Sequence, residues 1–249
     1  KCINIRKYGH EGSDEAPHFL GGFAEYCYVL PRTGIVRIPD EMSDEEAAPV
    51  MCGVPTMVSA TESVSIGIGD TVVIQGLGLL GLYGISIARA RGARTVIGLD
   101  SVEARLELAR KFGADQVFNV SEMGADELVG AVRDACPPDG ADAVIEVCGD
   151  PAVIPQGLDM LRVGGRYAVT GIAFPNACVS LDANRILARM ATIKGVHNYH
   201  PRHLVQALDF VERYRSMFPF KDLVDGRFAL RDLDLAFNSA ADRRVVRAA

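Results

Sequence analysis

Residues 71–81, TVVIQGLGLLG, join a short apolar run to a glycine-rich loop. The run Thr71–Gln75 is rich in β-branched residues, which favour a buried strand. The loop has the spacing Gly-x-Gly-x-x-Gly, and a helical segment follows it from about residue 82 to residue 91. We therefore expect a strand, a tight turn and a helix in direct succession.

Each glycine of this loop has a separate physical role in a dinucleotide-binding turn. Gly76 permits the tight turn, Gly78 lets a pyrophosphate approach the backbone, and Gly81 lets the helix pack close to the strand. The amides of Leu79 and Leu80 lie at the helix N-terminus, where they can donate to phosphate oxygens. A plain tight turn would also explain the glycines, but the strand before the loop and the helix after it favour a dinucleotide site.

An acidic residue, Asp100, ends the second predicted strand, residues 95–99. Its separation from Gly76 is near the expected value of about 20 residues. A carboxylate there accepts hydrogen bonds from the adenosine ribose hydroxyls and repels a 2′-phosphate, so it predicts NAD(H) rather than NADP(H). Arg105, one helical turn later, could reach the ribose or lie in solvent, and the sequence leaves both interpretations open.

The alternation of strands and helices continues beyond this unit. We expect further strands at 116–119, 143–147, 166–170 and 192–196, with helices at 104–112, 125–136 and 154–161. Continuous apolar strands separated by helices are typical of a parallel sheet covered on both faces. The sequence therefore predicts an α/β protein with a Rossmann doubly wound parallel sheet. Residues 22–29 alternate instead like an antiparallel strand, which predicts a second, different domain in the flanks.

Composition limits the class of partner. The chain has 249 residues, 49% of them hydrophobic, and a formal net charge of −6. No run of Lys and Arg is longer than Arg243-Arg244, so the chain lacks the basic patch of a nucleic-acid binder. No stretch approaches the roughly 20 apolar residues of a membrane span, and the first residues lack a signal-peptide pattern. With six scattered cysteines, the chain is predicted to be cytoplasmic and to bind a small molecule rather than nucleic acid or membrane.

Several further segments carry a family resemblance: 21–26, 38–40, 47–49, 52–56, 67–72 and 111–115. In order and spacing, together with the glycine loop and Asp100, they resemble the medium-chain dehydrogenase/reductase family. The specific resemblance is to its zinc-dependent alcohol dehydrogenase branch, and it covers essentially the whole chain. It implies three parts: an incomplete remnant of a GroES-like, mostly-β catalytic domain (1–50), a Rossmann NAD-binding domain (51–195) and a segment returning to the catalytic domain (196–249).

The resemblance also implies roles for single residues. Cys52 matches the third ligand of the catalytic zinc, and Thr56 matches a catalytic-site residue that contacts the nicotinamide. Cys2 resembles the last cysteine of a structural-zinc lobe. The resemblance implies that the wall around the nicotinamide and adenosine is formed by Val147, Thr170, Ile172 and Val196. For Cys52 the alternative is a small buried hydrophobe, the usual state of a free cysteine.

The activity implied for the intact protein is zinc-dependent, NAD-linked oxidation of an alcohol or polyol, with hydride passing from a CH–OH group to NAD. Homodimers or homotetramers are implied, pairing through the last sheet strand, which we place around residues 166–180. Since the family's remaining zinc ligands lie upstream of these residues, we expect this chain alone to bind cofactor without oxidising alcohols.

Two other functions remain open. One is a zinc-free NADPH quinone or enone reductase of the same superfamily, against which Asp100 and Cys52 both argue. The other is a non-enzymatic dinucleotide-binding or redox-sensing protein. The register of Cys52 and Thr56 favours the dehydrogenase over this second alternative. A metal site at His197, His200 and His203 is disfavoured, because the His200-Pro201 pair breaks the local backbone.

Overall fold

The computed structural model describes residues 8–9, 12, 14–242 and 244–249. They fall into two compact units, one of residues 38–224 and one formed by both ends of the chain, up to Arg37 and from Asp225 onward. The predicted division into residues 1–50, 51–195 and 196–249 is a division by function, whereas these units follow from packing alone. That division therefore stays a prediction.

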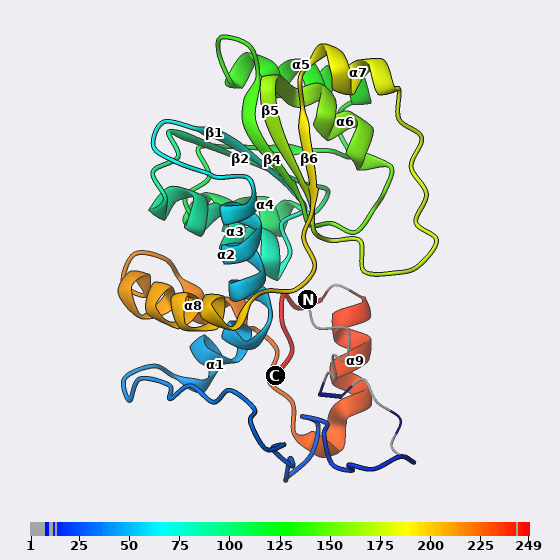
Figure 1. The fold of residues 1–249 in the computed structure, drawn as a ribbon. Coiled ribbons are helices and arrows are strands. Elements are labelled where there is room, and N and C mark those ends of the chain that lie inside the picture. Colours follow the sequence, from blue (N-terminus) through cyan, green and yellow to red (C-terminus); the bar gives the residue numbers. More distant parts are fainter. Residues whose placement is uncertain (1–7, 10–11, 13, 243) are drawn as a thin grey trace. The chain divides into compact units, whose positions relative to one another are not determined.

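The larger unit contains a six-stranded parallel sheet (Figure 1). Its strands are β1 (Thr71–Gln75), β2 (Thr95–Asp100), β3 (Gln116–Asn119), β4 (Ala141–Glu146), β5 (Leu161–Val169) and β6 (Thr192–Gly195). The order is β3-β2-β1-β4-β5-β6, and every neighbouring pair is parallel. The chain moves outward from β1 to β3 and then crosses to β4, so the direction reverses between β1 and β4. This is the strand order of the Rossmann fold and confirms the predicted fold class.

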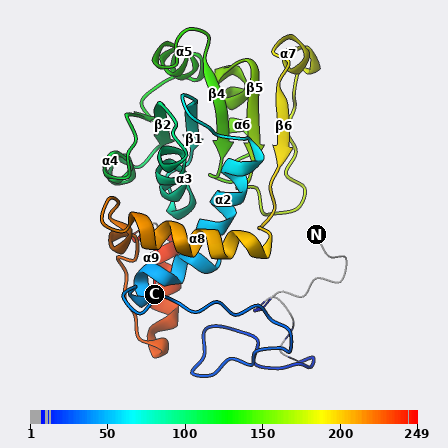
Figure 2. The ribbon, with the colours of Figure 1, turned by 60° about the vertical axis from the view of Figure 1, so that its left-hand side comes forward.

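The larger unit also contains α-helices, several of which connect and cover these strands (Figures 1 and 2). They are α1 (Asp44–Ala47), α2 (Gly53–Ser63), α3 (Leu79–Ala90), α4 (Glu103–Lys111), α5 (Ala125–Ala135), α6 (Val153–Met160), α7 (Ala183–Ala188) and α8 (Pro201–Tyr214). Short 3₁₀ helices occupy Ala48–Met51 and Phe220–Leu223, and the smaller unit holds α9 (Leu233–Ala241) after the 3₁₀ turn Leu230–Asp232. Of the helices in the described ranges, none is long and apolar enough to cross a membrane.

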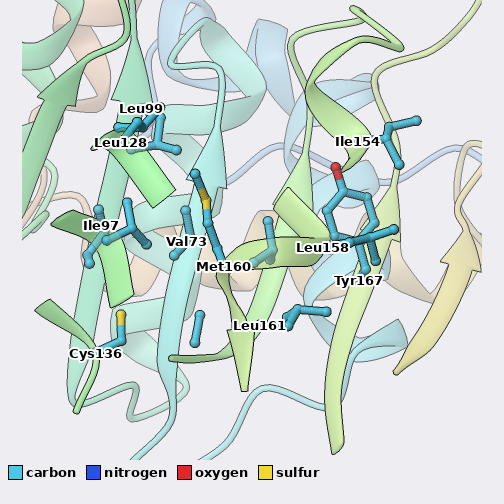
Figure 3. Close-up of a cluster of buried hydrophobic side chains, with 13 residues drawn as sticks. Val73, Ile97, Leu99, Leu128, Cys136, Ile154, Leu158, Met160, Leu161 and Tyr167 are labelled. Carbon is cyan, nitrogen blue, oxygen red and sulfur yellow. The ribbon is translucent and has the colours of Figure 1, made fainter. Parts of the chain in front are cut away.

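Both faces of the sheet are covered, which explains the unbroken apolar strands. On one face, Val73 and its neighbours on β2 and β4 pack against α5 and α6 in a single cluster, in which Leu128 and Leu158 are almost fully buried (Figure 3). On the other face, Ile74 lies close to Gly84 of α3 and to Met57 of α2. Successive residues of β1 therefore belong to two different cores.

The predicted antiparallel strand at residues 22–29 is wrong. These residues form bends and irregular coil, and Phe23 and Tyr26 are largely exposed. Their alternation has no matching partner, since the described part of the smaller unit contains only an isolated bridge between Gly226 and Ala248. A strand is stable only when a neighbour satisfies its backbone groups.

The predicted position of the sheet's last strand is also wrong. β5 is hydrogen-bonded on both sides, to β4 and to β6. The edge strand on this side of the sheet is β6, whose four residues are exposed, and Figure 2 shows it at the outer side of the sheet. Residues 166–169 therefore lie inside the sheet and cannot offer a free edge to another copy.

Candidate functional site

The glycine loop lies at the carboxyl end of β1, beside the point where the strand order reverses. Gly76 has φ +97°, a conformation that favours glycine, and its amide donates to the carbonyl of Leu99 at 2.8 Å. A Cβ on Gly76 would lie 2.7–2.8 Å from atoms of Cys148, and one on Gly81 would overlap the carbonyl oxygen of Gly76. Both positions therefore require glycine for steric reasons.

The N-terminus of α3 is open to an anion. Gly78 is the N-cap residue and no side chain caps the helix. A Cβ built on Gly78 would meet no atom within 4 Å, so space is free in front of the backbone. The first amides of a helix, here those of Leu79 and Leu80, have no acceptor within the helix, and the helix dipole favours negative charge beside them. The loop therefore fits the phosphates of a dinucleotide.

Asp100, at the end of β2, is tied to this loop. Its carboxylate is 8% exposed, accepts from the Leu77 amide at 2.7 Å through Oδ2 and from the Val102 amide at 3.0 Å through Oδ1. A guanidinium nitrogen of Arg105 lies 3.8 Å from Oδ2, and the Arg105 side chain is only 21% exposed. Of the two interpretations left open for Arg105, the solvated one does not hold, because the side chain faces the carboxylate.

The four predicted wall residues lie at the same edge of the sheet. Val147 follows β4 and donates its amide to Gln75, Thr170 follows β5, and Val196 follows β6 and donates to Val169. Ile172 lies in the same turn as Thr170 and packs against the core cluster. The hydroxyl of Thr170 is buried and has no hydrogen-bond partner among the described residues, so a bound molecule could satisfy it.

Cys52 and Thr56 lie in the first turn of α2. Cys52 is the N-cap residue and is exposed, unlike the buried hydrophobe of the alternative interpretation. Thr56 is 7% exposed and its hydroxyl donates to the carbonyl of Cys52 at 2.7 Å. Sequence reasoning missed Tyr199, whose hydroxyl donates to the carbonyl of Met51. Burial, with a smaller contribution from Cys52, raises the pKa of Tyr199.

The described residues do not fit a zinc ion. They contain no group of three or more His, Cys, Asp or Glu side chains that could hold a metal, whereas a catalytic zinc has three protein ligands. Cys2 lies outside the described residues. His200 caps α8 by accepting from the Arg202 amide, and His203 contacts Glu62 at 3.1 Å, so these histidines stabilise α8 and its contact with α2.

Sequence reasoning also missed Glu146, the last residue of β4. Its side chain is fully buried and both carboxylate oxygens accept backbone amides, from Gly149 at 2.6 Å and from Gly171 at 3.0 Å. The available signal was an acidic residue inside the apolar run at 143–147. Which groups it binds depends on two turns that are far apart in sequence.

Residues 80–213 match a protein-family model described as zinc-binding dehydrogenase. The chain belongs to the zinc-binding dehydrogenase family. This confirms the resemblance to zinc-dependent alcohol dehydrogenases. Among its relatives, L-threonine 3-dehydrogenase of Paraburkholderia phymatum is 32% identical over 218 residues, which are 87% of this chain and 60% of the relative. The chain thus spans about three-fifths of that relative.

Solved structures of the family agree with the fold. An alcohol dehydrogenase from Thermotoga maritima is 30% identical with a TM-score of 0.93, and the match covers 99% of this chain and 68% of that one. A zinc-binding dehydrogenase from Sinorhizobium meliloti, described as putative and bound to NADP, is 26% identical with a TM-score of 0.77, and covers 87% of this chain and 61% of that one. The match to the Thermotoga maritima enzyme covers almost the whole chain and therefore includes the site described above.

Proposed function

We propose that this chain binds a nicotinamide dinucleotide at the carboxyl edge of β1 and β4, with NAD(H) preferred over NADP(H). The observation that carries the proposal is the Asp100 carboxylate, held by the Leu77 amide of the glycine loop. Its buried position at the end of β2 would bring a 2′-phosphate next to a fixed negative charge. Arg105 is already paired with this carboxylate, so binding a phosphate would require Arg105 to leave Asp100.

For the whole protein we propose NAD-linked oxidation of an alcohol or polyol, or reduction of the matching carbonyl. The family and the dehydrogenase activities for which its relatives are named support this. When bound, the dinucleotide supplies the hydride acceptor. This chain contributes the phosphate loop, the carboxylate that selects the ribose, and the wall of Val147, Thr170, Ile172 and Val196.

Zinc belongs to the proposal only for the whole protein. Cys52 is exposed at the start of α2 and could supply one thiolate, but the described residues contain no group of three or more such ligands. Cys2 as a structural-zinc ligand stays a prediction. A homodimer or homotetramer is supported by β6, an exposed edge strand whose outer backbone groups can pair with another copy. A cytoplasmic location stays a prediction.

The test is a fluorescence titration of this chain with NADH and with NADPH. The protein has no Trp, so the nicotinamide signal is free of Trp background. We expect NADH to bind at least about tenfold more tightly, which corresponds to about 1.4 kcal/mol. In Asp100→Ala this preference should disappear or reverse.

Asp115→Ala is the matched control. Asp115 also accepts a backbone amide of β2, that of Val96 at 2.7 Å, and it pairs with Arg89. Val96 is near the start of β2, whereas Asp100 is at its end, so Asp115 lies away from the proposed cofactor site. Its replacement should lower stability and leave the NADH preference unchanged. Equal binding of both cofactors by the wild-type chain would contradict the Asp100 assignment and favour the NADPH reductase alternative. Binding of neither would contradict the cofactor site in this chain.

A further inference from the structure

We propose that Glu146 positions the nicotinamide half of the site by joining the turns that follow β4 and β5. This inference rests on the proposed dinucleotide binding and adds the residue that holds the cofactor's reactive end in place. It does not make Glu146 a catalytic residue, because the carboxylate acts through the backbone of the two turns.

The carboxylate connects the turns directly. Through Oε1 it accepts the amide of Gly149, in the turn after β4, at 2.6 Å. Through Oε2 it accepts the amides of Gly171 at 3.0 Å and Thr170 at 3.3 Å, in the turn after β5. The backbone carbonyl of Glu146 accepts the same two amides at 3.1 Å. One residue therefore supplies acceptors to both turns.

Two glycines allow the turns to close around this carboxylate. A Cβ on Gly171 would lie 2.6 Å from Oε1 of Glu146 and 2.7 Å from the amide nitrogen of Gly149. Gly149 has φ +81°, which favours glycine, and a Cβ there would lie 3.2 Å from the carbonyl oxygen of Gly171. The turns thus contact each other backbone to backbone, with no room for a side chain between them.

Burying this carboxylate for structural reasons alone would lower the stability of the fold. The carboxylate is 0% exposed, and no Lys, Arg or His among the described residues forms an ion pair with it. Its negative charge is stabilised by backbone amides, with a further hydrogen bond from the Cys148 side chain. Burying a charge costs free energy unless hydrogen bonds offset it. An apolar residue would fill the same volume more cheaply, but it could not fix the two turns to each other.

The joined turns carry residues of the wall predicted around the nicotinamide and adenosine. Val147 directly follows Glu146, and Thr170, with its unpartnered buried hydroxyl, donates its amide to the carboxylate. Cys148, between Val147 and Gly149, lies against Gly76 of the glycine loop. β4 and β5 lie on the other side of β1 from β2, which carries Asp100. The carboxylate contacts the two turns directly and the glycine loop only through Cys148, so a change in it would move the wall more than the adenosine end around Asp100.

The test compares NADH with ADP-ribose, which is the cofactor without its nicotinamide. Glu146→Gln keeps the shape but replaces one acceptor oxygen by an NH₂ group, so one turn loses its acceptor and faces a second donor. We expect NADH binding to weaken at least tenfold and ADP-ribose binding to change less than threefold.

The control is Asp142→Asn, four positions earlier on β4 and at the other end of the sheet. Asp142 also accepts a backbone amide, that of Thr71 at 2.8 Å, so its loss should lower the melting temperature without selectively weakening NADH. If Glu146→Gln does not fold, Glu146→Asp keeps the charge, falls one methylene short of the turns and should show the same selective loss.

Three outcomes would overturn the inference: unchanged NADH affinity in the Glu146 variants, equal weakening of NADH and ADP-ribose, or the same selective loss in Asp142→Asn. The proposed function would fail differently, since the wild-type chain would then bind neither ligand.

Discussion

An alanine at Gly81 would place its Cβ 2.9 Å from the carbonyl carbon of Gly76 and closer still to its oxygen. Carbon atoms pack best at about 3.5–4.0 Å, so relieving the contact with the carbonyl carbon alone would require α3 to shift by roughly 0.6 Å, and the closer oxygen requires a larger shift. The neighbour is backbone of the glycine loop and has no rotamer that relieves the overlap. Such overpacking costs about 1–3 kcal/mol, offset by up to about 1 kcal/mol of better helix propensity.

Gly81→Ala is therefore expected to lower stability by about 1–2 kcal/mol, which corresponds to roughly 2–8 °C in melting temperature. NADH affinity should fall at least about tenfold, because the shift moves the Leu79 and Leu80 amides away from the phosphates. Differential scanning fluorimetry and a fluorescence titration measure the two effects.

Gly84→Ala, one turn later in α3, is the matched control. Its Cβ would meet Met57 Cε at 2.7 Å, but this is the end of a flexible side chain that can move aside. We expect a stability change below about 1 kcal/mol and unchanged NADH affinity. A Gly81→Ala protein as stable as wild type and with full NADH affinity would refute the steric reasoning.

Three further predictions concern stability and reactivity. Burial alone would raise the pKa of Asp142, but hydrogen bonds from Thr71 and Arg162 outweigh it and hold that pKa below its usual value. Asp142→Asn should therefore lower the free energy of unfolding by about 1–2 kcal/mol at pH 7. In urea unfolding, the difference from the wild type should shrink as the pH falls below about 4, and a difference that does not change with pH would contradict this. Gly130→Ala, at a helical position of α5 with no atom within 4 Å of the new Cβ, should raise stability by about 0.5–1 kcal/mol, measured by the same unfolding curves. Partial burial, helped by the charges of Glu146 and Asp150, raises the pKa of Cys148 to about 11, so iodoacetamide should modify it more slowly at pH 8 in the folded chain than in urea.

Local sequence was sufficient for the sheet but not for every helix boundary. The bounds of β1 and β3 agree with the prediction, because their residues have the apolar pattern of buried strands. The helix after the glycine loop starts at Leu79 rather than near residue 82. Glycine has poor helix propensity, so Gly81 by itself favours a loop. In the structure Gly81 nevertheless lies inside α3, where it packs against the Gly76 carbonyl so closely that no side chain would fit.

The sequence by itself determined the Rossmann strand and helix order, the glycine loop and the acid at the end of β2. These follow from periodicity, burial and glycine spacing, which act between residues close in the chain. Only the tertiary structure decided that β6 is the edge, that residues 22–29 form no strand, and that Arg105 faces Asp100. It also placed the Glu146 carboxylate between the turns after β4 and β5. The physical reason is that strand pairing and converging turns join residues far apart in sequence, so no local pattern records them.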